Sequence, residues 1–147
     1  MVTHDRAVPI GTYTDAEELG ADLQDAVLDR AAGRELLTRL MDEETYRTAV
    51  AGLDALAPGF ADWMVVCLFG GTYQRGVLAD RDRQVATLAA LVTLGSVEPQ
   101  LTGHVRTALR LGMTAAEVTE VVVHLAPYVG TPRALAALRC VRAALDG

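Results

Sequence analysis

The hydrophobic positions of this chain recur with the period of an α-helix along most of its length, and short breaks divide them into segments. The breaks carry the usual signals of helix ends, which are proline at a first position, glycine past the last one and a Thr-x-x-Glu capping box. In the C-terminal half they predict four helices in close succession. These run over residues 81–94, from Glu98 to Gly112, from Thr114 to Gly130, and from Thr131 onward.

The N-terminal half gives similar signals. We expect a loose arm over residues 1–13, breaks at Gly33 and at Pro58-Gly59, and a stop at Gly70-Gly71. Helices are expected between these points, over residues 15–32, 34–41, 42–56 and 60–69, with residues 72–79 as a link. The expected organisation is an N-terminal arm and helix extension, residues 1–33, followed by a helical domain, residues 34–147.

Composition favours helices throughout. Alanine and leucine are abundant, the chain has one isoleucine, and β-branched residues cluster only at residues 121–123. A length of 147 residues with 51% hydrophobic residues is that of a single domain with a substantial core. The sequence therefore predicts an all-α, single-domain bundle of about six to eight helices.

Charge and residue usage exclude several classes of protein. A net charge of −6 argues against a nucleic-acid partner, and no apolar run approaches the roughly 20 residues that span a bilayer. Cys67 and Cys140 lie far apart, so they form no zinc or disulfide framework, which suits a reducing, cytoplasmic location. All 13 basic residues are arginine, which excludes lysine Schiff-base chemistry.

The segment 81–94 has almost no polar face after its first turn. A helix that is apolar all round needs neighbours on every side, and a chain this small has few helices to supply them. We expect a partner subunit to cover part of it, so the protein should be a homo-oligomer. A helix wrapped entirely within one subunit is the other interpretation.

Several of these stretches resemble the carboxymuconolactone decarboxylase family, which includes the alkylhydroperoxidase D-type proteins. The resemblance rests on RDRQVATLAAL (81–91), LTGHVR (101–106), GMTAAEV (112–118) and EVVVHLAPYVGTPRA (120–134), and on residues 60–75 as the family's first conserved helix. It implies an orthogonal or antiparallel helical bundle of the alkylhydroperoxidase D-like type that assembles as a trimer or hexamer.

The peroxidase branch of that family combines a glutamate, a Cys-x-x-Cys pair and a histidine. With the chain aligned on Gly95, Gln84 stands at the glutamate position, and Ser96 and Pro99 stand at the cysteine positions. The thiol relay is therefore missing, and a thiol peroxidase is the least favoured function unless Cys67 and Cys140 meet in the fold.

The decarboxylase branch needs neither thiol nor cofactor. It needs a clamp for a carboxylate, donors for a developing enolate oxygen, and an acid that returns a proton. The resemblance implies catalytic roles for His104, His124 and Arg83 and a pocket that both histidines share. It implies substrate binding by the residues Arg75, Arg106 and Tyr128.

Each of these residues has a structural interpretation as well. His104 and His124 lie among apolar residues, so their structural interpretation is that of packed core positions. The structural interpretation of Arg81 and Arg83 is that of solvated first-turn residues, and we prefer Arg83 for the site. Two histidines without a third ligand make a metal site improbable, so we expect no metal and no cofactor.

The chain also departs from the decarboxylases, which usually have Gly-Asp where it has Gly70-Gly71. We therefore expect a cofactor-independent decarboxylase, or a related lyase or isomerase, with a small cyclic carboxylated or enolisable substrate of its own. The alternative is a non-catalytic helical oligomer that binds a ligand or a partner protein.

Overall fold

The computed structural model describes residues 28–147. Within them, all regular structure is helical, which confirms the predicted all-α class. No helix in this part of the chain has both the length and the apolar character that crossing a membrane requires. The elements are α1 (Arg30–Leu40), α2 (Glu43–Val50), α3 (Leu53–Leu56), α4 (Phe60–Leu68), a short 3-10 helix (Thr72–Gln74), α5 (Asp80–Leu94), α6 (Glu98–Arg110), α7 (Ala115–Val129) and α8 (Thr131–Asp146).

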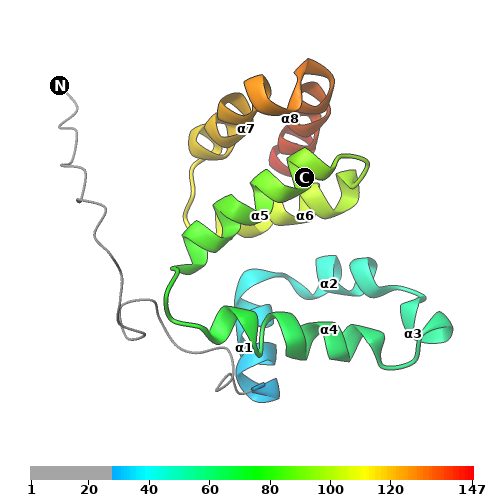
Figure 1. Ribbon diagram of the computed structural model, residues 1–147. Helices are drawn as coiled ribbons and strands as arrows, with labels where there is room; N and C mark the ends of the chain where they lie inside the picture. The colour runs from blue at the N-terminus through cyan, green and yellow to red at the C-terminus, as the bar shows by residue number, and fades with distance from the viewer. Residues whose placement is uncertain (1–27) are drawn as a thin grey trace.

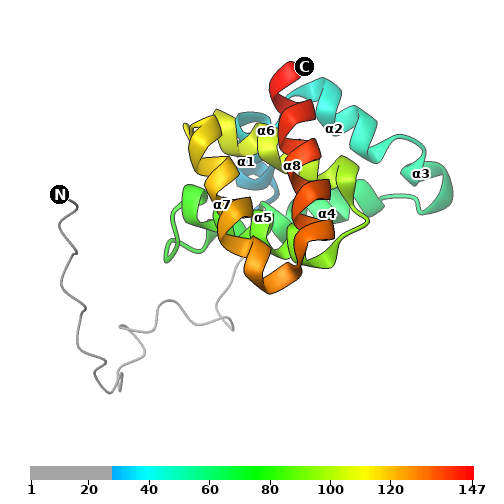
Figure 2. The same cartoon turned by 90° about the horizontal axis from the view of Figure 1, so that it is seen from above.

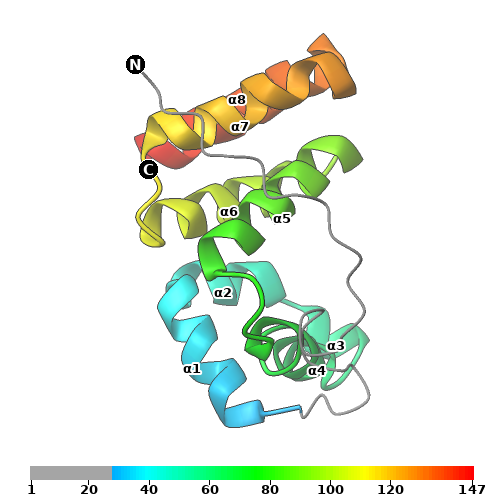
Figure 3. The ribbon, with the colours of Figure 1, turned by 60° about the vertical axis from the view of Figure 1, so that its left-hand side comes forward.

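The helices form two groups (Figure 1). Helices α5–α8 pack against one another as a four-helix bundle, and α1 packs against α4 in a second layer below it. Figure 3 shows the bundle as two tiers, with α7 and α8 above α5 and α6. In the view from above, α3 lies at the edge of the molecule (Figure 2).

Each group has a hydrophobic core of its own. The core of the second layer consists of Leu36, Leu40, Val65 and Phe69, with Tyr46, Tyr73 and Leu111 packed around it. The larger core lies inside the four-helix bundle and is built from its buried aliphatic residues, which are Leu88, Val92, Leu101, Val105, Ala108, Met113, Val118, Val122, Ala134, Ala137, Cys140, Val141 and Ala144. Burial of this apolar area is the main stabilising term of the fold.

The helix ends of the bundle agree with those expected from the sequence. At the start of α7, the Thr114 hydroxyl accepts the backbone N–H of Glu117, and the Glu117 carboxylate accepts the backbone N–H of Thr114 at 2.8 Å. Gly95 and Gly130 follow α5 and α7 with positive φ. These signals are local, so they determine where a helix ends without help from the rest of the fold.

The expected break at Gly33 is wrong, because α1 runs through this residue. Gly33 is buried where α1 meets the end of α4, and a Cβ on it would lie 2.7 Å from the backbone nitrogen of Gly70. Glycine is present for this close approach of two backbones, not as a helix stop. The expected domain boundary between residues 33 and 34 thus falls inside α1.

The helix expected over residues 15–32 also needs correction at its end. Asp29 has extended φ and ψ, and its side chain accepts the backbone N–H of Ala32, so a new helix starts at Arg30. The remainder of the expected helix, with its cap Thr14, and the arm over residues 1–13 lie outside the described residues.

The single helix expected over residues 42–56 is in fact two helices. It is interrupted after Val50 because Gly52 adopts φ +77°, and the short α3 follows. Hydrophobic periodicity does not reveal such a break, since the residues on either side continue the same pattern.

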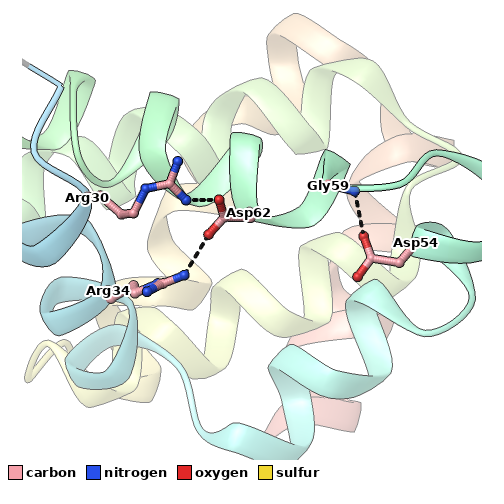
Figure 4. A network of polar contacts seen from close by, with 5 residues as sticks. All are labelled: Arg30, Arg34, Asp54, Gly59 and Asp62. Atoms are coloured by element: carbon pink, nitrogen blue, oxygen red, sulfur yellow. Dashed lines mark hydrogen bonds and ion pairs between the residues drawn. The ribbon is translucent and has the colours of Figure 1, made fainter.

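Exposed polar contacts fix the geometry of the second layer (Figure 4). The carboxylate of Asp62 on α4 accepts hydrogen bonds from Arg30 and, at 2.8 Å, from Arg34, both on α1. Asp54 accepts the backbone N–H of Gly59 at 3.2 Å, which ties α3 to the turn before α4. Exposed ion pairs contribute little free energy, so we read them as contacts that set orientation.

Candidate active site

A large cavity lies between the two layers of helices. Its volume is about 1070 Å³, and its walls come from α1, α2, α4, α6 and the end of α8. Much of the lining is apolar or aromatic, including Leu37, Tyr46, Met64, Leu68, Phe69 and Leu109. Its size is that of a small-molecule site, and its polar groups are concentrated on α2 and α6.

His104 is the cavity residue with the most distinctive surroundings. It lies in the middle of α6, where residues 101, 105 and 108 face the bundle core, and it lines the cavity together with Thr102 and Gly103. Burial lowers the pKa of the His104 imidazole below its ordinary value of 6.5. The side chain therefore stays neutral near pH 7.

The side chain of Gln84 on α5 contacts both the backbone and the ring of His104. The Gln84 side chain is 0% exposed, and its amide nitrogen donates to the backbone carbonyl of His104 at 2.7 Å. The same nitrogen lies 3.1 Å from the imidazole Nδ1. The amide oxygen of Gln84 is buried and has no hydrogen-bond partner among the described residues.

Charged side chains line the cavity from two helices. Arg106 and Arg110 come from α6, and Asp42 and Glu44 come from the start of α2. Asp42 caps α2: hydrogen bonds from the backbone N–H and the hydroxyl of Thr45 lower the pKa of its carboxyl group. Its carboxylate also lies 3.5 Å from Arg110. Arg106 has no ion-pair partner among the described residues and is the free cation best placed to bind an anion.

Arg83 and Arg75 do not line this cavity. The Arg83 guanidinium donates to the backbone carbonyl oxygens of Leu78 (3.2 Å) and Arg75, and it lies 5.5 Å from the centroid of the Tyr73 ring. These contacts tie the segment before α5 to the second layer. One guanidinium nitrogen of Arg75 is buried without a hydrogen-bond partner in the described part of the chain.

His124 and Tyr128 are both exposed on α7, and neither lines the cavity. Their rings pack against each other with centroids 5.6 Å apart. The expectation that His104 and His124 share a pocket is therefore not met within one subunit. The four-residue spacing places His124 beside Tyr128, whereas residues 118 and 122 occupy the buried face of the helix.

The two cysteines are not bonded to each other. Cys67 is half-buried on α4 and Cys140 is buried on α8. Ser96, at one aligned cysteine position, lines a smaller cavity of about 230 Å³ at the turn between α5 and α6 and has φ +57°. Among residues 28–147 there is no cluster of three or more His, Cys, Asp or Glu side chains with the spacing of a metal site.

Sequence reasoning noticed Gln84 only as a replacement for a glutamate. A stronger signal was available, because residues 84, 88 and 92 lie on one stripe of α5, and the other two are apolar. A polar side chain on a buried stripe requires a hydrogen-bond partner. The contribution of α2 to the cavity had no such signal, because it depends on how the second layer packs.

The fold and this cavity define an all-α protein with a neutral, partly buried histidine between two layers of helices. The family model described as carboxymuconolactone decarboxylase family matches residues 58–143, which is more than half of the chain, and the protein belongs to that family. The matched residues include α4–α7 and most of α8, and thus His104 and Gln84. Helices α1–α3 precede them.

Two curated relatives are similar to the chain in sequence. The chain is 27% identical over 106 residues to a 4-carboxymuconolactone decarboxylase of Acinetobacter baylyi, a match that covers 72% of this chain and 78% of that protein. It is 32% identical over 81 residues to an uncharacterized 15.0 kDa protein in the nqo9-nqo10 intergenic region of Paracoccus denitrificans, covering 54% of this chain and 60% of that protein.

Proposed function

We propose that the protein is a cofactor-independent decarboxylase, or a closely related lyase or isomerase, whose small carboxylated or enolisable substrate binds in the cavity between α2 and α6. The observation that carries the proposal is a neutral histidine and an unpaired arginine, His104 and Arg106, in the wall of one mostly apolar cavity. Family membership and the named relative from Acinetobacter point to the same reaction class.

The chemistry follows from these two residues and the lining. Arg106 binds a substrate carboxylate through charge-assisted hydrogen bonds. The largely apolar lining solvates the charged carboxylate less well than bulk water does and so favours its loss as CO₂. The electron pair left on carbon moves to an adjacent carbonyl oxygen, where a hydrogen bond from His104 stabilises the resulting enolate. A proton then adds to the carbon that lost CO₂.

The roles expected for Arg83, His124, Arg75 and Tyr128 stay predictions. Within one subunit, Arg83 is engaged with backbone carbonyl oxygens, and His124 and Tyr128 are exposed on α7. The two α7 side chains can reach a cavity of this kind only if an oligomer brings them to a neighbouring subunit.

The test is CO₂ release from a panel of small acids that includes 4-carboxymuconolactone. We expect His104→Asn and Arg106→Gln each to lower kcat/KM by about 10²–10³ without a comparable loss of thermal stability, as is usual when one oxyanion donor is removed. The matched control is Arg139→Gln, which alters an exposed arginine of α8 outside the cavity and should retain activity.

The result that contradicts the proposal is equally clear. If no acid is turned over, while small carboxylates raise the melting temperature of the wild-type protein but not of Arg106→Gln, the cavity is a binding site without catalysis. The non-catalytic ligand-binding alternative then holds.

A further inference from the structure

The hydrogen bonds of Gln84 determine which nitrogen of His104 carries a proton. A backbone carbonyl oxygen only accepts hydrogen bonds, so the Gln84 atom 2.7 Å from the His104 carbonyl must be the NH₂ group. That same NH₂ group lies 3.1 Å from Nδ1. One of its hydrogens donates to the carbonyl oxygen, and the other is available to donate to Nδ1.

Nδ1 must therefore act as an acceptor and carry no proton. In a neutral imidazole the proton is then on Nε2. Imidazolium is disfavoured in the same place, because an N–H at Nδ1 would face the N–H of Gln84. Burial of the ring acts in the same direction. The ring atom left for a ligand in the cavity is Nε2.

The charged groups around the cavity do not oppose this assignment. Asp42 and Glu44 contribute carboxylates from α2, and Arg106 and Arg110 contribute guanidinium groups from α6. From α5, the uncharged Gln84 contacts the ring without lining the cavity. None of these charged groups forms a hydrogen bond or ion pair with the His104 ring. The contact with Gln84 is the specific interaction at Nδ1.

We infer that Gln84 is a positioning residue that fixes His104 as the neutral Nε2–H tautomer, so that the histidine offers the cavity a hydrogen-bond donor and neither a base nor an imidazolium acid. This inference deepens the proposed function and rests on it for its catalytic meaning. The preferred ligand presents an acceptor oxygen, such as a carboxylate or enolate oxygen, to Nε2.

The assignment has a chemical consequence for the proposed reaction. A neutral imidazole is a very weak acid, so it stabilises the enolate oxygen but keeps its own proton. The proton that forms the new C–H bond then comes from a water molecule, and hydroxide leaves the site to be neutralised by solvent. The bond broken is C–CO₂, and the electron balance is that of a simple decarboxylation.

The experiment is long-range ¹H–¹⁵N NMR of the full chain, in which each imidazole shows its tautomer. The chain has three histidines, and the His104 signals are those lost in His104→Asn. At pH 7 we expect His104 to prefer the Nε2–H form by about tenfold or more, the ratio that one hydrogen bond can supply. A dominant Nδ1–H form or an imidazolium in the wild type would overturn the inference.

Two substitutions of Gln84 and one control sharpen the test. A carboxylate accepts from Nδ1–H, so Gln84→Glu should invert the tautomer ratio and move the titration of His104 to higher pH. Gln84→Met removes the donor and should give a mixture of tautomers. The control is Thr107→Val on α6. Thr107 is also buried and polar, but its hydroxyl donates to the Gly103 carbonyl at 3.3 Å, so this substitution should leave the tautomer ratio unchanged.

The outcomes separate this inference from the proposed function. If the wild-type spectrum shows the Nε2–H form but no acid is decarboxylated, Gln84 positions a ligand-binding histidine and only the reaction is wrong. If a folded Gln84→Met protein retains the wild-type tautomer ratio, Gln84 does not position the ring, whatever the activity. Should Gln84→Glu fail to fold, the wild-type spectrum and Gln84→Met still decide.

Discussion

At the scale of single residues, His104 connects the cavity to the stability of the fold. Its pKa is lowered by burial, so between the folded pKa and 6.5 the unfolded chain binds more protons than the folded one. The contribution of His104 is therefore fully present above about pH 6.5 and is lost as the pH falls toward the folded pKa.

We predict that the free energy of unfolding of the wild type decreases below about pH 6.5, by at most about 1.4 kcal/mol per pH unit for this one proton. His104→Asn should lose that part of the slope, because asparagine does not titrate. Urea unfolding between pH 5 and 8 measures it. His124→Asn is the control, and a slope that is equal in all three proteins would contradict the prediction.

Arg83 gives a second prediction at this scale. Its guanidinium joins two backbone carbonyl oxygens and the Tyr73 ring, so Arg83→Ala should lower the melting temperature. Arg83→Lys should restore little of the loss, because an ammonium group cannot reproduce the planar fork. Activity is measured on the same samples at a temperature where all are folded. A large loss of kcat with an unchanged melting temperature would support the catalytic role expected from the sequence.

At the scale of helices, the contact between α1 and α4 depends on glycine. A Cβ at Gly33 would lie 2.7 Å from the Gly70 nitrogen, and both partners are backbone. Gly71 is similarly enclosed, with a Cβ placed 2.8 Å from the Cys67 carbonyl oxygen. An aspartate at position 71 would bring its Cβ equally close to this carbonyl oxygen, so the backbone would have to shift to hold it.

We predict that Gly33→Ala destabilises the protein even though alanine is the better helix former. The matched control is Gly103→Ala in α6, where the new Cβ would meet only Thr45 at 3.9 Å. That substitution should be neutral or stabilise by about 0.5–1 kcal/mol. Urea denaturation of the two variants gives the comparison, and equal effects would show that the close approach of α1 and α4 is not limiting.

These helices also show how far the sequence can be read. The ends of α5–α8 were predictable because capping residues and positive-φ glycines act locally. The break expected at Gly33 was wrong because glycine occurs at sites of close backbone packing as well as at helix ends. Only the position of Gly70 in the fold shows which of these two roles Gly33 has. The break at Gly52 was hidden because the apolar pattern continues through it.

At the scale of the whole molecule, the bundle leaves apolar surface uncovered. Leu94 on α5 is 66% exposed and Tyr128 on α7 is 77% exposed. Ala86 and Ala90 of α5 and Val123 of α7 are exposed as well. A single subunit thus does not enclose the apolar helix that the sequence indicated, which is why we expect copies of the chain to associate through this face.

We predict that the protein sediments as a closed trimer or hexamer of the 15.6 kDa chain at micromolar concentration. Leu94→Glu should shift the distribution toward smaller species, because it places a charge in the interface. Leu56→Glu is the control, since Leu56 is also an exposed leucine, at 86%, but lies on α3, in the other layer. A wild-type monomer would contradict the prediction, and so would an identical shift in both variants.

The site, unlike the helices, was only partly accessible from the sequence. His104 and Arg106 were named because they fall in a recognisable stretch of α6, and both line the cavity. The expected shared pocket of His124 and His104 depended on how α6 and α7 pack, which the sequence pattern does not give. Two exposed rings on α7 and a partly buried ring on α6 look alike in a one-dimensional pattern.

The cavity is lined partly by residues that match the family model and partly by residues that precede the match. Its α6 wall, with His104, lies inside the stretch that matches the family model, whereas the wall formed by α1 and α2 precedes residue 58. Substitutions in α2 can therefore change the shape and charge of the cavity without displacing Gln84 or His104. The space open to a ligand can thus change through α2 alone, while the α6 wall stays as it is. A hybrid chain that carries the α2 of a relative would show how far this helix determines which ligand is bound.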